Sequence, residues 1–86
     1  MPYKITAKGI HFLSDLNKYV RPETQAKVSG LTDWQMEVLK YLETRKDDGY
    51  VASHDIGYDL KEHPRAISGI AYSLIKKGLV EKKPGE

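Results

Sequence analysis

The stretch His63–Lys83, HPRAISGIAYSLIKKGLVEKK, decides the fold of this chain. Its apolar residues fall at helical spacing and form one stripe, made of Ile67, Ile70 or Ala71, and Leu74. Pro64 suits the first position of a helix, where a missing N–H costs nothing, and Gly78 suits a left-handed C-cap. The stretch therefore predicts a helix over 64–77 followed by a strand over 79–83.

Periodicity and capping residues predict the other elements. In chain order these are a strand over 3–6, a helix over 7–20, a connection over 21–30 with room for one helical turn, a helix over 33–46, a turn over 47–49, a short strand over 50–52 and a short helix over 54–60. Thr6, Thr32 and Ser53 are the expected N-caps, and Gln35 completes a capping box with Thr32. Gly9 is expected to weaken the first turn of its helix. The helix pair around residue 61, joined by a short connection, is typical of a helix-turn-helix.

The predicted core consists of the apolar stripes of these helices. They comprise Ile10, Leu13, Leu16 or Asn17, and Val20 on the first helix, Trp34 or Gln35, Val38, Leu39 and Leu42 on the second, and Ile56 and Leu60 on the third. Trp34, Phe12 and the tyrosines are expected in the core or at its rim, and not as a platform on which single-stranded bases stack.

Composition bounds the class of protein. A chain of 86 residues, 40% hydrophobic and 30% charged, indicates one small globular domain. It contains no cysteine, which excludes disulfides and cysteine-bound zinc. No apolar run approaches the roughly 18 residues of a membrane span, and the N-terminus lacks the layout of a signal peptide, so we expect a cytoplasmic protein that does not bind membranes.

Charge is distributed unevenly along the chain. Residues 1–30 hold five cations and two acids, residues 31–59 hold three cations and seven acids, and residues 60–86 hold six cations and three acids. The chain is therefore basic at both ends and acidic in the middle, although its net charge is only +2. A basic patch can attract an anionic partner even when the whole protein is nearly neutral.

The sequence gives little support for catalysis, and we expect neither an enzyme nor a bound cofactor. Ser53, His54 and Asp55 cannot act as a triad, because adjacent residues on a helix do not face one another. Asp55, Asp59 and His63 could approach a metal ion, but their spacing matches no known ligand motif. We expect these side chains to lie on a solvent-exposed helix face.

Residues 31–83 resemble the winged-helix DNA-binding domains of bacterial and archaeal transcription regulators. The segments that carry the resemblance are LTDWQMEVLKYL, VASHDIGYDL and RAISGIAYSLIKKGLVEKK, and the ending L-x-K-K-G-L-V-E is similar to the recurring rLeekGLVer of such families. The resemblance implies an α+β, mostly α fold, a winged helix-turn-helix with a small two- or three-stranded sheet. Residues 31–86 would form the helix-turn-helix core and wing strand, and residues 1–30 an extra strand, helix and connection.

The chain departs from this family in the order of its parts. In the family the first wing strand turns back into a second, often followed by LTeKG and a helix, whereas this chain ends where the wing would turn. The segment YKITAKGIHFL at 3–13 is similar to that missing tail. We therefore expect the strand over 3–6 to pair with the strand over 79–83, either within one chain or between two chains of a swapped dimer.

The resemblance implies sequence-specific binding to double-stranded DNA by a homodimeric transcription regulator, with helix 64–77 in the major groove. Arg65 and Ser68 would meet bases in the first turns, while Ala66 and Gly69 would let the helix approach closely. Lys76 could contact phosphate or simply favour the negative end of the helix dipole. The candidate DNA-binding residues are Ser53, His54, Lys61, Arg65, Ala66, Ser68, Gly69, Tyr72, Ser73, Lys76, Lys82 and Lys83.

A second function fits the same fold. Some winged helices bind only protein, so the chain could be an interaction module within a larger assembly. The acidic segment 31–59 favours this alternative, because such a surface repels phosphate. The target sequence, the sign of regulation and any small-molecule effector stay undetermined by the sequence.

Overall fold

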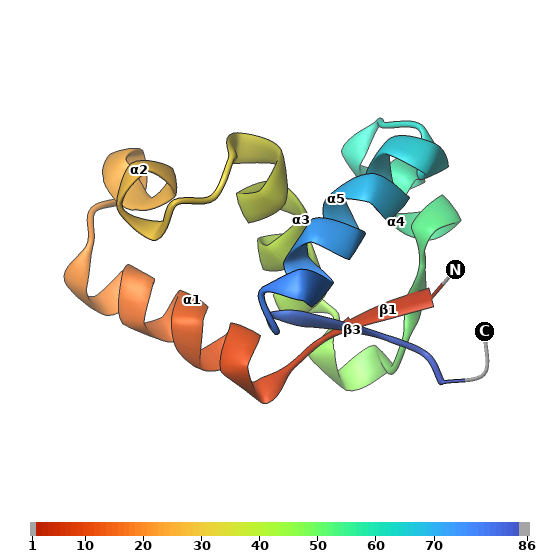
Figure 1. Cartoon of the computed structure of the whole chain (residues 1–86), viewed down its shortest axis with the longest axis horizontal. Helices are drawn as coiled ribbons and strands as arrows, with labels where there is room; N and C mark the ends of the chain where they lie inside the picture. Colours follow the sequence, from red (N-terminus) through yellow and green to blue (C-terminus); the bar gives the residue numbers. More distant parts are fainter. Residues whose placement is uncertain (1, 85–86) are drawn as a thin grey trace.

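The structure, a computed structural model, describes residues 2–84. Its elements are β1 (Pro2–Ile5), α1 (Ala7–Tyr19), the 3₁₀ turn η1 (Pro22–Thr24), α2 (Gln25–Ser29), α3 (Asp33–Thr44), the 3₁₀ turn η2 (Lys46–Asp48), β2 (Val51–Ala52), α4 (Ser53–Leu60), α5 (Pro64–Lys76) and β3 (Val80–Lys82). The fold is α+β and mostly helical, as predicted, with a small sheet on one side of the helices (Figure 1). The predicted elements are present, with boundaries shifted by one or two residues.

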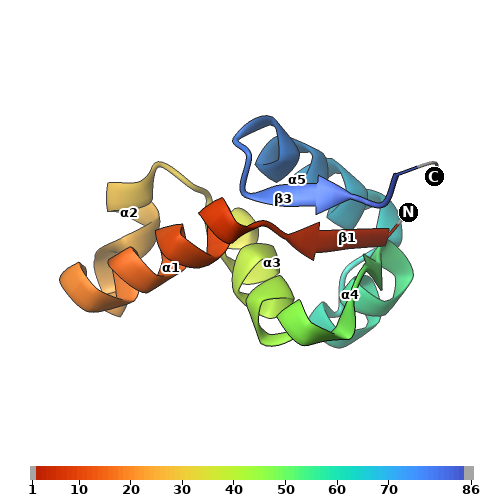
Figure 2. The same ribbon diagram turned by 90° about the horizontal axis from the view of Figure 1, so that it is seen from below.

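The sheet has three antiparallel strands in the order β2-β1-β3. Tyr3 lies opposite Lys82 and Ile5 opposite Val80, so the predicted pairing of the first and last strands is confirmed, and it forms within one chain. The two ends of the described chain consequently lie side by side (Figure 2). The backbone N–H of Lys83 donates to the carbonyl of Pro2 at 3.1 Å.

The start of α1 is joined to the end of α5 by a set of contacts that we call the terminal seam, residues 6–9 and 77–79. Thr6 caps α1 as predicted, since its hydroxyl oxygen accepts from the N–H of Gly9 at 3.0 Å. The same hydroxyl donates to the carbonyl of Gly78 at 2.7 Å, and the Thr6 N–H donates to the carbonyl of Leu79 at 3.1 Å. The ammonium of Lys8 donates to the carbonyl of Lys77 at 3.1 Å. These bonds satisfy the carbonyl of the C-cap residue Lys77 and those of the two residues that follow it, Gly78 and Leu79.

Gly9 corrects one prediction. It was expected to be a weak point of its helix, yet it is the residue on which the terminal seam closes. A Cβ built at this position would lie 2.3 Å from the carbonyl oxygen of Leu79 and 2.7 Å from Cγ1 of Ile5. Only glycine allows the backbone of α1 to come this close to the segment before β3.

The core lies between α3, α5 and the inner face of the sheet. Its buried residues are Tyr3, Ile5, Leu13, Leu16, Leu31, Met36, Val38, Leu39, Leu42, Val51, Ile56, Ile67, Ala71, Leu74, Leu79 and Val80. Of the open alternatives, Leu16 and Ala71 are buried, whereas Asn17 is exposed and Ile70 is half-buried. Trp34 is 40% exposed, so the stripe of α3 begins at Met36. Tyr19, Tyr58 and Tyr72 are also exposed, contrary to the expectation that tyrosines lie in the core or at its rim.

The junction before α4 corrects a second prediction. Ala52, and not Ser53, is the N-cap of α4, because β2 runs directly into the helix and Ser53 is already its first helical residue. Ser53 is 6% exposed and lies inside the junction. After α4 the chain turns sharply at Lys61, whose φ of +57° is left-handed. Gly57 makes this turn possible, since a Cβ there would lie 2.4 Å from the carbonyl oxygen of Glu62.

The connection over 21–30 forms the predicted helical turn and slightly more, as η1 and α2. Gln25 is buried, and its side-chain amide donates to Oδ1 of Asn17 at 3.0 Å and to the carbonyl of Val20 at 3.3 Å. These bonds fasten α2 to the end of α1, and α1 in turn packs on α3. Within residues 2–84, no helix combines the length and apolar character that crossing a membrane requires.

Candidate nucleic-acid interface

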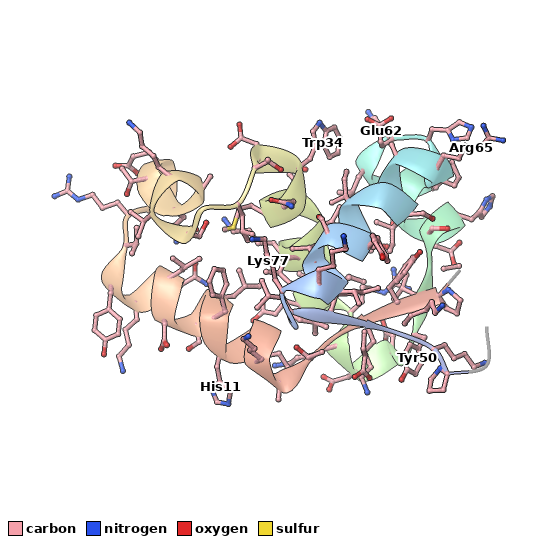
Figure 3. The ribbon with its side chains drawn as sticks, viewed as in Figure 1. His11, Trp34, Tyr50, Glu62, Arg65 and Lys77 are labelled. Carbon is pink, nitrogen blue, oxygen red and sulfur yellow. The ribbon has the colours of Figure 1, made fainter. Side chains whose placement is uncertain are left out.

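Helix α5, which carries most of the predicted site residues, has a buried side and an exposed side. Ile67, Ala71 and Leu74 are buried against the core. The opposite side is exposed, and we call it the outer face of α5; it consists of Arg65, Ala66, Gly69, Tyr72 and Lys76. Helix α5 contains no acidic residue, so this face carries two cations and no carboxylate. Figure 3 shows Arg65 at one end of the molecule, with its side chain directed away from the ribbon.

Gly69 lies at the middle of the outer face and packs against no other element within residues 2–84. No atom of the described residues lies within 4 Å of a Cβ built at this position, beyond its own helix backbone and neighbours. A glycine inside a helix costs roughly 0.5–1 kcal/mol relative to alanine. Unlike Gly9 and Gly57, Gly69 therefore carries a stability cost that no contact inside the chain explains.

The first turn of α5 is held by the residue before the proline. His63 is the N-cap, and its Nδ1 accepts from the N–H of Arg65 at 3.1 Å. The N–H of His63 donates to the Glu62 carboxylate at 2.9 Å. Pro64 occupies the first helical position, as predicted. This cap could have been predicted from the sequence, because the residue before a proline at the first helical position is where an N-cap belongs.

Tyr72 and Lys76 form a pair on the outer face. The Lys76 ammonium lies 4.9 Å from the centre of the Tyr72 ring, and Tyr72 is 59% exposed. This contact holds the cation along the exposed side of the helix. At the negative end of the α5 dipole, the carbonyl of Lys77 accepts a hydrogen bond from the ammonium of Lys8. A cation other than Lys76 therefore interacts with this end of the helix.

The two serines of α5 lie at the borders of the outer face, and both are half-buried. The hydroxyl of Ser73 donates to the carbonyl of Ile70 at 2.6 Å and accepts from Nε2 of Gln35 at 2.7 Å. Ser73 therefore fastens α5 to α3.

Lys82 and Lys83 are exposed, at and just beyond the end of the edge strand β3. The acid beside them, Glu81, accepts from the hydroxyl of Tyr50 at 2.9 Å. That bond raises the pKa of the Tyr50 phenol, with partial burial as the second cause. Lys4 lies opposite Glu81 on β1 and places its ammonium 5.8 Å from the Tyr50 ring. The end of β3 therefore carries two lysines next to Glu81, whose carboxylate is already hydrogen-bonded to Tyr50.

The candidates near α4 fall in different surroundings. His54 is exposed in the first turn of α4 and Lys61 is exposed at its C-cap. Ser53 is buried, which leaves its hydroxyl little surface for a phosphate. The site residues therefore converge only in part: α5 presents one continuous face, while the others flank it or are buried.

A network of side chains links α3, η2 and α4. The Tyr41 hydroxyl donates to the Asp59 carboxylate and accepts from Nη1 of Arg45 at 2.7 Å. Nε of Arg45 pairs with Asp48 at 2.6 Å. Burial and the bond to Asp59 raise the pKa of the Tyr41 phenol, against the lowering effect of Arg45. This network, which the sequence analysis did not anticipate, neutralises part of the acidic middle segment.

Two cavities are lined by residues outside α5, one of about 370 Å³ beside α2 and the start of α3 and one of about 350 Å³ between α1 and α2. Among residues 2–84 no three His, Asp or Glu side chains gather closely enough to hold a metal ion. Comparison with protein-family models, with curated protein sequences and with solved structures finds no match to this chain.

Proposed function

We propose that the protein binds double-stranded DNA through the outer face of α5 and acts as a transcription regulator of the winged-helix type. The single observation that carries this proposal is the composition of that face. It is exposed, free of carboxylates, and contains a glycine with open space above it. A major groove of B-DNA admits one α-helix, and cations with small residues suit its phosphates and base edges.

The topology supports the winged-helix assignment. A winged helix is expected to have a three-stranded sheet with the second wing strand in its centre. On one side this central strand pairs with the strand that follows the recognition helix, and on the other side with the strand that precedes the helix pair. Here β3 follows α5, β1 pairs with β3, and β2 lies on the other side of β1. Strand β1 would then be the second wing strand, supplied by the start of the chain. Lys82 and Lys83 would lie on this wing, at and just beyond the end of β3 and beside the start of β1.

Within this proposal the residues have different tasks. Arg65 would read a base, since an arginine can bind guanine bidentately. Lys76, Lys82 and Lys83 would contact phosphates, with His54 and Lys61 as flanking contacts. A homodimer would read two half-sites about 34–36 Å apart.

The experiment is fluorescence anisotropy with labelled duplex DNA at about 50 and 200 mM salt. Affinity should fall steeply as salt rises, because binding to phosphates releases counterions. Selection from a random duplex pool would then supply the preferred site. Absence of binding at the lower salt concentration would overturn the proposal.

One observation favours the second candidate, a protein-interaction module. The exposed side of α4 carries Asp55, Asp59 and Tyr58, and Tyr58 is 82% exposed. Exposed aromatic residues are common at protein interfaces. A partner captured equally by the wild type and by Arg65→Glu, together with no duplex binding, would favour this function.

A further inference from the structure

The N-cap of α5 is a histidine, and its hydrogen bond requires one protonation state. Nδ1 of His63 accepts from the N–H of Arg65 at 3.1 Å. A nitrogen that accepts carries no proton, so the imidazole in this structure is neutral, with its proton on Nε2. An imidazolium donates from both nitrogens and cannot make this bond.

We propose that His63 is a pH-sensitive cap, which holds the first turn of α5 when neutral and releases it when protonated. Protonation removes the acceptor of the Arg65 N–H and places a positive charge at the helix N-terminus, where the helix dipole disfavours it. Both effects act in the same direction. The turn that loosens is the turn that presents Arg65 and Ala66.

The groups around His63 leave the histidine as the responsive one. Glu62 and Arg65 lie on its own segment, and Asp59 and Lys61 lie toward the end of α4, which packs against α5. Among side chains with unperturbed chemistry, only histidine changes charge between pH 5 and 8. His54, in the first turn of α4, makes none of the capping bonds of α5.

The pH-sensitive cap does not depend on DNA binding, but its effect on DNA recognition rests on the proposed function. If α5 reads DNA, an ordered first turn is needed for base recognition, whereas an added charge near phosphates favours any duplex. Lowering the pH should therefore reduce the preference for the specific site over random DNA. The expected loss of preference is about tenfold, the equivalent of one helix cap.

The first measurement uses the free protein and no DNA. Long-range ¹H–¹⁵N spectra of the His63 ring at pH 8 should show the Nε2–H tautomer. Between pH 8 and 5.5 the backbone amides of Arg65 and Ile67, which bond to Nδ1 and to the carbonyl of His63, should lose protection against hydrogen exchange, after correction for intrinsic rates. A ring protonated on Nδ1 at pH 8, or protection that does not change, would overturn the proposal.

Variants separate the cap from other titrations. His63→Asn keeps a side-chain oxygen that can cap the helix and cannot titrate, so protection at Arg65 should become independent of pH. His63→Ala should resemble the low-pH state at every pH. His11→Asn is the matched control that should keep the wild-type response, since His11 lies on α1, far from Arg65 (Figure 3).

The two proposals fail in different ways. If Arg65 protection follows the titration of His63 but no duplex binds at any pH, the cap stands and the DNA-binding function is wrong. If duplex binds but His63→Asn keeps the wild-type pH dependence of protection and of site preference, the function stands and the pH-sensitive cap is wrong.

Discussion

Gly9 and Gly69 are both glycines inside helices, yet they lie in opposite surroundings. Gly9 closes the terminal seam against the carbonyl oxygen of Leu79, whereas Gly69 has open space above it on the outer face of α5. In the seam the polar groups of Thr6 and Lys8 find partners elsewhere in the chain, while Arg65 extends from the outer face into solvent. The difference suggests a rule for this molecule: changes in the seam should alter stability, and changes on the outer face should alter binding.

The largest effect is expected from Gly9→Ala. The new Cβ would meet the backbone of Leu79, whose carbonyl is fixed by the N–H of Thr6 at 3.1 Å. Overpacking against backbone costs about 3 kcal/mol, a large part of the stability of so small a domain. Chemical denaturation monitored by circular dichroism would measure the loss.

Gly69→Ala is the matched control for this first prediction, because it adds the same methyl group to a helix where nothing opposes it. A Gly9→Ala protein as stable as the wild type would show that the seam is looser than its contacts indicate. It would also remove the main contrast between the two regions.

The next effect concerns Arg65 and Lys82, both exposed, one on the outer face and one on β3. Arg65→Ala should weaken binding to the preferred site by ~1–3 kcal/mol and affect random DNA much less. Lys82→Ala should weaken both DNAs alike and reduce the salt slope by about one unit. Neither substitution should lower the melting temperature much. Anisotropy titrations with both duplexes would measure these changes.

Two outcomes would change the assignment of Arg65. Equal losses on specific and random DNA would make Arg65 a backbone contact. A destabilised protein would make it structural and would place the recognition surface elsewhere.

The same contrast explains how much the sequence could predict. The caps at Thr6, Thr32 and Gly78 were predictable, because each depends on residues within a few positions along the chain. The pairing of β1 with β3 was predictable only from the resemblance, which supplied the missing strand. The close approach of Gly9 to Leu79 could not be predicted, because the two residues are far apart in sequence and no local pattern at either one indicates the contact.

Prediction of the candidate site was limited in the same way, because some of its contacts join residues that are far apart in sequence. Helical periodicity indicates that Arg65, Ala66 and Gly69 lie off the apolar stripe, and all three are exposed. Periodicity alone could not show that Ser73 bonds to Gln35 of α3, because that contact depends on how two helices pack. The prediction of Ser53 as the N-cap was wrong because β2 runs directly into α4. The N-cap is therefore Ala52, the last residue of the strand, whose type is not typical of a cap.

A smaller effect is expected from Gly69→Ala itself. Alanine should raise the free energy of unfolding by up to about 1 kcal/mol, since it reduces the flexibility of the unfolded chain and favours the helix. If the outer face approaches DNA closely, the same methyl group should weaken duplex binding. Denaturation and anisotropy on one preparation would show the two opposite changes. A more stable protein with unchanged affinity for every duplex would indicate that this part of α5 does not approach DNA closely.

The smallest effect concerns Tyr41 at alkaline pH. Tyr41 donates to Asp59 within the chain, whereas Tyr72 belongs to the outer face and contacts Lys76 of the same helix. Burial and the bond to Asp59 raise the pKa of the Tyr41 phenol above its unfolded value of 10.0. A raised pKa means that the folded protein favours the protonated phenol. The associated stability is therefore fully present below about pH 10 and is lost as the pH rises through the folded pKa. Tyr41→Phe should therefore reduce the fall in melting temperature between pH 9 and 11. Thermal melts of the wild type and the variant across this range would test this, and an equal fall in both proteins would show that the Tyr41 bond does not contribute to stability.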